Sequence, residues 1–141
     1  MKDENCAYCM EGELVAKFGI KICELPASKV YLFKEQSHRG RVIVASRHHV
    51  SEMIDLPDGD RRAFMDDVAK VAAAIRKLFA PKKINYGAYG DTGCHLHFHL
   101  VPKYEGDSFE WGGVFAMNPD RTYLDEAGYR GLVDKIAAEL G

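Results

Sequence analysis

The sequence lacks long hydrophobic runs and has no excess of charge of one sign. Among its 141 residues, 19 lysines and arginines nearly balance 21 aspartates and glutamates, so the net charge is −2. Binding to a nucleic acid polymer requires a basic surface, and this composition does not predict one. No apolar stretch approaches the roughly 20 residues that cross a membrane, and residues 1–5 lack the apolar region of a signal peptide. These absences predict a cytoplasmic protein that neither binds nucleic acid polymers nor spans a membrane.

Internal repeats, low-complexity tracts and interdomain linkers are also missing from the chain. A hydrophobic content of 47% is sufficient for one domain with a sizeable core, whereas two domains would be cramped in this length. We therefore expect a single domain over residues 1–141.

Cysteine is scarce, and only two of the four cysteines have a recognisable spacing. Cys6 and Cys9 form a C-x2-C pair, which in a reducing compartment indicates metal binding or redox chemistry. A thioredoxin-like motif needs a preceding strand and a following helix, and Cys6 lies too close to the start of the chain for that arrangement. A metal is favoured if two further ligands exist, although a short C-x2-C also occurs by accident.

The apolar pattern predicts an α+β domain with an antiparallel sheet of about five strands, one long helix and a C-terminal helix. Apolar residues recur at helical spacing over residues 59–79 and again over about 123–140. Strands are expected at residues 14–17 and 20–23, which would form a hairpin around Gly19, and at residues 30–33, 41–45, 83–89 and 94–104.

Half of the six histidines stand at alternate positions of the last strand. Successive side chains of a strand point to opposite faces, so His95, His97 and His99 are expected to share one face. The alternative is a polar strand surface whose histidines are individually solvated or hydrogen-bonded. Three histidines at alternate positions favour a functional site over that alternative. The backbone positions of His95 and His99 would lie roughly 13 Å apart, so the three histidines can bind one metal ion only if the strand bends. A neutral imidazole is also a good nucleophile at pH 7, and that role requires no bending.

Residues 95–101, His-Leu-His-Phe-His-Leu-Val, fit the His-φ-His-φ-His-φ-φ pattern, where φ is apolar, and the sequence resembles the histidine-triad (HIT) family there. The resemblance implies that His97 attacks an α-phosphate to form a nucleotidyl-histidine intermediate, while His99 orients and polarises the site. The implied substrates are nucleoside phosphoramidates, dinucleoside polyphosphates or adenylylated amines. The same resemblance, with the apolar surface of the long helix and of residues 83–89, predicts a homodimer.

Many bacterial HIT proteins pair a C-x2-C with a histidine after an internal strand and with the first triad histidine. On that pattern Cys6, Cys9, His49 and His95 are expected to hold zinc, with His48 the less favoured ligand. Alternatively, His48 and His49 are two exposed loop histidines. Four protein ligands leave no position for water, so this zinc would be structural.

The turn before the triad departs from the commoner family pattern. Many members have Gly-Gln-Ser-Val there, whereas this chain has Asp91 in place of the glutamine and Thr92 as a possible hydroxyl donor. Asn85, Asp91 and Thr92 are the candidate substrate-binding residues, although an ionised Asp91 beside a phosphate would repel it. Residues 34–37 stand where many members have a ribose-binding aspartate. Gln36 and Arg41 belong to a Gln-x3-Gly-Arg pattern that marks a subgroup of the family.

Two other functions remain open at this stage. A zinc-stabilised nucleotide-binding or interaction protein with little catalysis is favoured by Asp91 but does not require an intact triad. A catalytic zinc enzyme that uses the triad as ligands would need a further ligand that the sequence does not identify.

Overall fold

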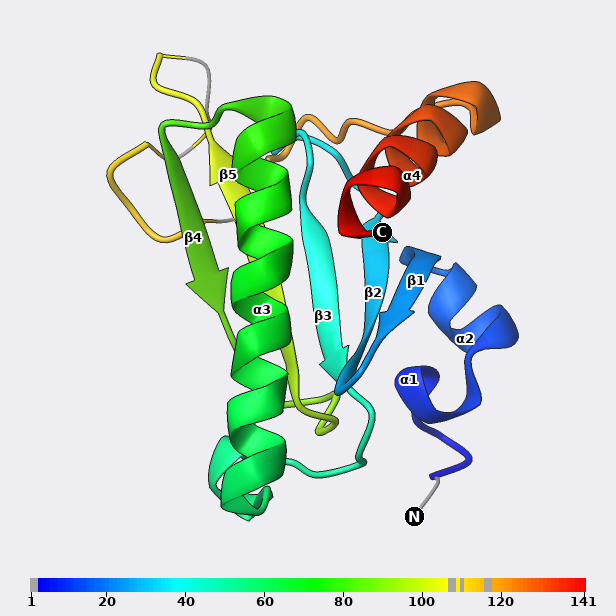
Figure 1. Cartoon of the computed structure of the whole chain (residues 1–141). Coiled ribbons are helices and arrows are strands. Elements are labelled where there is room, and N and C mark those ends of the chain that lie inside the picture. The colour runs from blue at the N-terminus through cyan, green and yellow to red at the C-terminus, as the bar shows by residue number, and fades with distance from the viewer. Residues whose placement is uncertain (1–2, 107–108, 110, 116–117) are drawn as a thin grey trace.

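The computed structural model describes residues 3–106, 109, 111–115 and 118–141, and it contains a five-stranded antiparallel sheet in the order β1-β2-β3-β5-β4 (Figure 1). The strands are β1 (Gly19–Leu25), β2 (Ser28–Phe33), β3 (Val42–Ser46), β4 (Lys83–Gly87) and β5 (His97–Lys103). The expected α+β class and the number of strands are confirmed. β1 and β4 are the two edges of the sheet.

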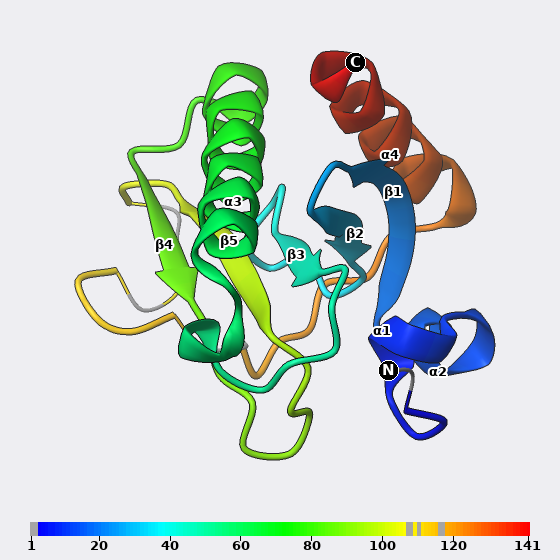
Figure 2. The same cartoon turned by 60° about the horizontal axis from the view of Figure 1, so that its bottom comes forward.

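The long helix α3 (Asp58–Phe79) and the C-terminal helix α4 (Glu126–Leu140) pack on one side of the sheet, as Figure 2 shows. Alternate residues of the inner strands face them, because a strand sends every second side chain to the same side. The resulting core includes Val30, Leu32, Val42, Val44 and Leu100 from the sheet and Phe64, Val68, Val71 and Ile75 from α3. No helix within the described part of the chain has the length and apolarity needed to cross a membrane.

The other side of the sheet is covered by two short N-terminal helices, α1 (Ala7–Met10) and α2 (Gly12–Ala16). Here the expected strand at residues 14–17 is wrong, because most of that stretch lies in α2. A run of four residues is compatible with both helical and strand periodicity. The helix forms because α2 buries Val15 in a second apolar cluster with Tyr8, Tyr31 and Ile43. The hairpin of this region is formed by β1 and β2 instead. A 3-10 turn, η1 (Met53–Asp55), precedes α3.

The register of β3 against β5 fixes which side carries the triad. Ala45 lies opposite His97, and Ile43 lies opposite His99. Directly paired residues project to the same face, so both histidines share the face of the second apolar cluster. Leu96 and Leu100 lie in the core on the other side. The expected alternation is therefore confirmed, although β5 begins only at His97.

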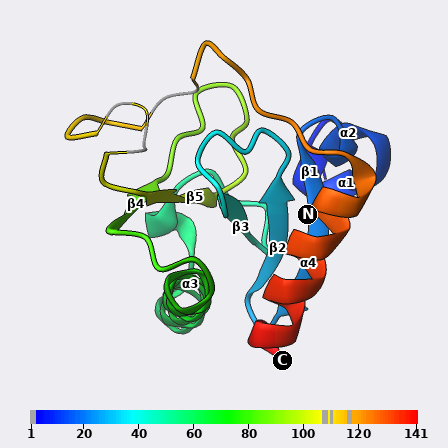
Figure 3. The ribbon, with the colours of Figure 1, turned by 90° about the horizontal axis from the view of Figure 1, so that it is seen from above.

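The segment that joins β5 to α4 passes over this second face. Figure 3 shows residues 118–125 running on the side of the sheet away from α3. Thr122 anchors this segment to the loop after β2, because its carbonyl oxygen accepts a hydrogen bond of 2.8 Å from the backbone N–H of Gln36. The histidine face is thus framed by the N-terminal helices on one flank and by this segment on another.

Candidate active site and metal centre

Four side chains from three separate segments meet beside the start of β5. Cys6 and Cys9 belong to α1 and its N-cap, His49 follows β3, and His95 precedes β5. Their ligand atoms all lie within 4.8 Å of one another. Cys6 Sγ is 3.4 Å from His95 Nδ1, Cys9 Sγ is 3.2 Å from His49 Nδ1, and the two Nδ1 atoms are 3.1 Å apart.

These separations fit the donor atoms of one tetrahedral metal ion. Zinc bonds of about 2.3 Å to sulfur and about 2.0 Å to nitrogen place neighbouring ligand atoms roughly 3.3–3.8 Å apart. His95 Nε2 lies 2.6 Å from the carbonyl oxygen of Ser46, which can only accept a hydrogen bond. Nε2 therefore carries the ring proton, and the Nδ1 lone pair faces the two cysteines, as a metal ligand requires. This cluster can hold a metal through four protein ligands.

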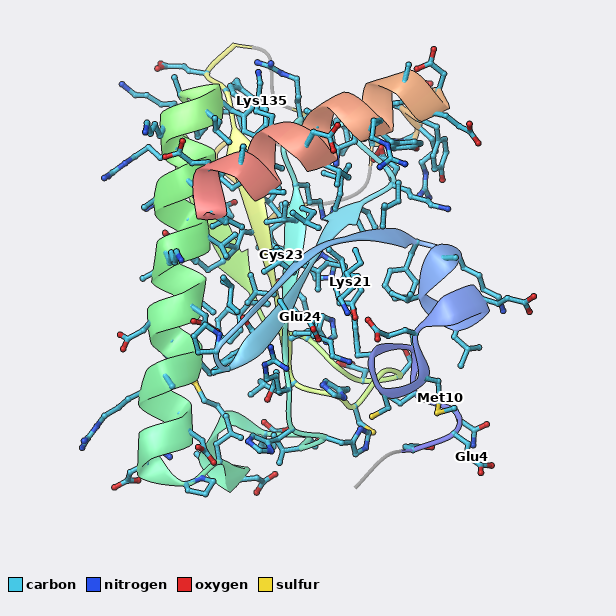
Figure 4. All side chains as sticks on the ribbon, turned by 45° about the vertical axis from the view of Figure 1, so that its right-hand side comes forward. Glu4, Met10, Lys21, Cys23, Glu24 and Lys135 are labelled. Atoms are coloured by element: carbon cyan, nitrogen blue, oxygen red, sulfur yellow. The ribbon has the colours of Figure 1, made fainter. Side chains whose placement is uncertain are left out.

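The neighbouring histidine and the other two cysteines lie outside the cluster. His48 points away from His49 to the exposed side, with its Nε2 3.6 Å from an Asp60 carboxylate oxygen. In Figure 4, Cys23 on β1 lies well away from Met10, which ends the helix α1 that carries Cys9. Cys94 is exposed on the turn before His95.

One ring nitrogen of His97 is held by a hydrogen bond, and the other has no partner among the described residues. Its Nδ1 lies 2.7 Å from the carbonyl oxygen of His95, so Nδ1 carries the proton and Nε2 keeps its lone pair. Burial lowers the pKa of His97, a residue that is 8% exposed, and this favours the neutral ring at pH 7. A buried neutral imidazole with a free, oriented nitrogen is suited to nucleophilic attack.

Tyr8 connects the metal cluster to His97. Its ring centroid lies 5.4 Å from that of His95 and 5.0 Å from that of His97, and Tyr8 is buried. Since Tyr8 stands between the two cysteines of α1, a metal bound by these cysteines would fix this ring against both histidines. Tyr8 was not among the site residues expected from the sequence, and its position inside the C-x2-C is the only sequence signal that could have indicated a role.

His99 is paired with a buried arginine. Arg41 Nε and Nη2 lie 3.3 and 3.0 Å from His99 Nδ1, and a guanidinium can only donate. His99 Nδ1 is therefore an acceptor, and its ring proton is on Nε2. Burial and the charge of Arg41, with a smaller effect of His97, lower the pKa of His99 to about 3.

A loop held together by Gln36 positions Arg41. The Gln36 amide nitrogen donates to the carbonyl oxygens of Phe33 (2.6 Å) and Arg41 (3.2 Å), and its oxygen accepts from the Gly40 amide. Gly40 has a φ of 91°, and a Cβ there would lie 2.8 Å from the ring of Phe79, so this position requires glycine. The residues of the Gln-x3-Gly-Arg pattern thus hold the loop that leads into β3 in one conformation.

Residues 34–36 do not supply a ribose-binding carboxylate. Lys34 donates to a backbone carbonyl of α2, and the Glu35 carboxylate accepts from Ser37 and from the Thr122 amide. The side-chain amide of Gln36 bonds Phe33, Gly40 and Arg41, so all three side chains bind groups of the protein itself. None of them lines the cavity at His97.

A cavity of about 780 Å³ opens in front of the triad. It brings together the expected His97, His99, Asp91 and Thr92, and its wall includes Cys6, His49 and His95 of the metal cluster. Asp91 and Thr92 are exposed at its rim. Asn85 is not part of it: this residue lies on β4 and lines separate depressions beside Lys83.

Comparison with known proteins gives consistent matches. The family model for the HIT domain matches residues 20–106. Protein hit of Bacillus subtilis is 28% identical over 131 residues, which cover 83% of each chain. Adenosine 5'-monophosphoramidase HNT1 of Saccharomyces cerevisiae is 24% identical over 135 residues, with 89% of this chain and 78% of the yeast protein covered.

A solved structure supports the same fold. The Zn-bound histidine triad family protein of Mycobacterium smegmatis superposes with a TM-score of 0.67 at 22% identity, covering 96% of this chain and 92% of that one. The matched domain spans more than half of the chain and includes the complete triad from His95 to His99. The chain therefore belongs to the HIT family.

Proposed function

We propose that the chain is a nucleotide hydrolase or nucleotidyltransferase that acts at the α-phosphate of a nucleoside phosphoramidate or dinucleoside polyphosphate. His97 attacks phosphorus through Nε2, the bond to the leaving group breaks, and a nucleotidyl-histidine forms that water or an acceptor then cleaves. The observation that carries this proposal is the hydrogen bond from His97 Nδ1 to the His95 carbonyl, because it directs an uncommitted lone pair into the cavity. Family membership and the name of the yeast relative support the substrate class.

The turn before the triad is proposed to contact the phosphate. Thr92 can donate its hydroxyl, and backbone amides of residues 90–94 can bind non-bridging oxygens. Asp91 would favour an amine-containing leaving group over a second phosphate, because an ionised carboxylate repels a phosphate and attracts an ammonium group. A substrate role for Asn85 stays a prediction without support from its position on β4.

We propose zinc as the metal of the cluster, with a structural role. Two cysteines and two histidines form a donor set typical of structural zinc, and the relative from Mycobacterium smegmatis is described as Zn-bound. When bound, the ion supplies rigidity to the segment that carries Tyr8 and His95.

The remaining proposals concern assembly and location. Within the described part of the chain β4 pairs with β5 alone, and its Tyr86 is 53% exposed, so a second copy could extend the sheet there in a homodimer. A cytoplasmic location, the absence of nucleic acid or membrane partners, and a single domain over residues 1–141 stay predictions.

The test is turnover of an adenosine phosphoramidate and of a dinucleoside polyphosphate by the zinc-loaded protein and by His97→Ala. We expect wild-type turnover of at least one class and a loss of about 10³-fold or more in His97→Ala, because removal of a nucleophile eliminates the covalent route. His48→Ala, outside the cavity, is the matched control.

A second candidate function is a nucleotide-binding protein with little catalysis, and the exposed carboxylate of Asp91 at the rim is the observation that favours it. It predicts nucleotide binding by calorimetry with no turnover of either substrate class and no difference between wild type and His97→Ala.

A further inference from the structure

The triad face contains a charged residue for which the expected reaction has no role. Arg41 is 5% exposed, and its guanidinium lies between aromatic rings, 4.2 Å from the centroid of Phe33 and 5.1 Å from that of Phe115. Its Nη1 is buried and has no hydrogen-bond partner among the described residues. A buried cation is costly unless it is paired, so this placement requires an explanation.

No carboxylate within the described part of the chain forms an ion pair with Arg41. Glu35 is close enough to act on it electrostatically, but its oxygens accept hydrogen bonds from Ser37 and Thr122. Burial lowers the pKa of Arg41 to about 10, which still leaves it protonated at pH 7. The positive charge is therefore not compensated by a direct partner.

Arg41 is also the single lysine or arginine that lines the cavity within the described residues. The other charged groups of that lining are the carboxylates of Asp3 and Asp91, which would repel a phosphate. Among the described residues of the lining, Arg41 is thus the one fixed positive charge that can stabilise the negative charge developing on a transferring phosphoryl group.

We propose that Arg41 is a positioning residue that fixes His99 as the neutral Nε2–H tautomer and strengthens this N–H as the hydrogen-bond donor to a non-bridging oxygen of the α-phosphate. The inference rests on the proposed function and specifies how charge on the transferring phosphoryl group is stabilised. Two guanidinium hydrogens converge on His99 Nδ1, so the ring can present only Nε2–H to the cavity.

The two histidines of β5 then have opposite tautomers with different tasks. His97 has its proton on Nδ1 and attacks with the Nε2 lone pair, whereas His99 has its proton on Nε2 and donates. Their ring centroids are 5.4 Å apart, so one phosphoryl group can contact both rings. His97 forms the new bond to phosphorus, and the leaving group departs with the electron pair of the old bond and takes a proton from water. His99 remains neutral and transfers no proton.

The fold holds Arg41 in this place before any substrate binds. The amide of Gln36 bonds both ends of the loop from Phe33 to Arg41, and Gly40 permits the close approach of Phe79. A donor that is already oriented stabilises developing charge without reorganisation during the reaction. The Gln-x3-Gly-Arg pattern therefore serves the reaction through a residue that is adjacent to His99 in space and 58 positions away in sequence.

The test combines kinetics with histidine nitrogen NMR on zinc-loaded protein. In the wild type we expect the His99 ring to show the Nε2–H signature from pH 8 down to pH 5. Arg41→Met should remove this fixed tautomer and lower kcat by about 100-fold with little change in KM, because the donor acts on charge that develops in the transition state. Arg41→Lys keeps the charge and one donor, and should recover about tenfold of the loss.

Arg41→Gln separates orientation from charge, since an amide N–H can hold the tautomer but brings no charge. It should keep the Nε2–H signature and still show a reduced kcat. Arg39→Met is the control, because Arg39 lies in the same loop but stacks on Phe79 and Tyr104 outside the cavity. If Arg41→Met fails to fold, the comparison of Arg41→Lys with Arg41→Gln still decides the question.

Wild-type rates in Arg41→Met, or a His99 signature unchanged in that variant, would overturn the inference while leaving His97 catalysis intact. A wild-type protein that turns over neither substrate class would overturn the proposed function, and with it the role given to Arg41. A loss in Arg41→Met that Arg41→Lys does not recover, with an altered circular dichroism spectrum, would assign Arg41 a structural role only.

Discussion

Tyr8 lies against His97 with the two ring planes inclined by 36° and the centroids 5.0 Å apart. The same ring contacts His95, which belongs to the metal cluster. One buried side chain therefore contacts both a residue proposed to hold zinc and the residue proposed to attack phosphorus. We therefore expect the order of the active site to depend on the metal.

The first prediction concerns the effect of losing the metal. The zinc-loaded wild type should contain about one zinc per chain, and Cys6→Ser should contain almost none and melt at a lower temperature. Metal analysis with thermal unfolding measures both quantities. Cys23→Ser, which changes a cysteine outside the cluster, is the control and should keep its zinc. A freshly prepared wild type without any metal would contradict the assignment.

Tyr8→Ala should lower kcat and destabilise the fold, because it removes the ring that packs on His97. Truncation of a buried aromatic side chain typically costs about 3 kcal/mol. No hydrogen bond to the hydroxyl has been identified in the described residues, so Tyr8→Phe should behave like the wild type. Urea unfolding and single-turnover rates provide the comparison. Equal activity of the alanine and phenylalanine variants would show that the ring does not order His97.

The stability of the folded chain should fall as the pH is lowered through the histidine range. His99 has a pKa of about 3 in the fold against 6.5 for an ordinary histidine, because burial, Arg41 and His97 disfavour its charged form. Between these values the unfolded chain binds a proton that the folded chain does not, so the free energy of unfolding decreases with falling pH. The loss from this residue amounts to about 2 kcal/mol at pH 5.

His99→Gln should therefore show a smaller difference in unfolding free energy between pH 7 and pH 5 than the wild type. Urea unfolding at constant zinc content measures this, so that loss of metal at low pH does not contribute. His48→Gln removes an exposed histidine outside the cavity and serves as the control. If the pH dependence of His99→Gln equals that of the wild type, the pKa of His99 is not lowered as described.

The β4 edge predicts the oligomeric state. Sedimentation at micromolar concentration should give a species of twice the 15.8 kDa chain mass, and Tyr86→Asp should shift it toward the monomer. Tyr123→Asp, the same substitution at an exposed tyrosine outside β4, is the charge-matched control. A wild type that sediments as a monomer alone would rule out the proposed dimer.

Periodicity and spacing predicted the parts of the site that depend on local sequence. The alternation of residues 95–99 placed the triad on one face. The C-x2-C indicated a metal, and the resemblance to bacterial HIT proteins added His49 and His95, which the structure brings together with the two cysteines. These predictions succeeded because strand geometry and metal chemistry impose strict patterns on the chain. The helical periods of α3 and α4 were equally clear.

What the sequence did not predict depends on tertiary contacts. The short apolar run at residues 14–17 fits a strand or a helix, and only its packing beside Tyr31 decides for α2. Arg41 was visible as part of a pattern, but its pairing with His99 arises from the register of β3 and the loop that precedes it. Asn85 was a candidate substrate-binding residue, but it lies on β4 and does not line the cavity, so that role stays a prediction.

The central claim is a covalent bond between His97 and the nucleotide, and rapid-quench mass spectrometry of the zinc-loaded protein with a nucleoside phosphoramidate tests it most directly. We predict an intact mass increased by one nucleotidyl group within the first turnover, with the modification located on His97 in the peptide that contains β5. His97→Ala should show no adduct while keeping its zinc and its fold, and His99→Ala should form the adduct more slowly. Turnover by the wild type without any adduct on His97, or turnover of His97→Ala at the wild-type rate, would contradict the account.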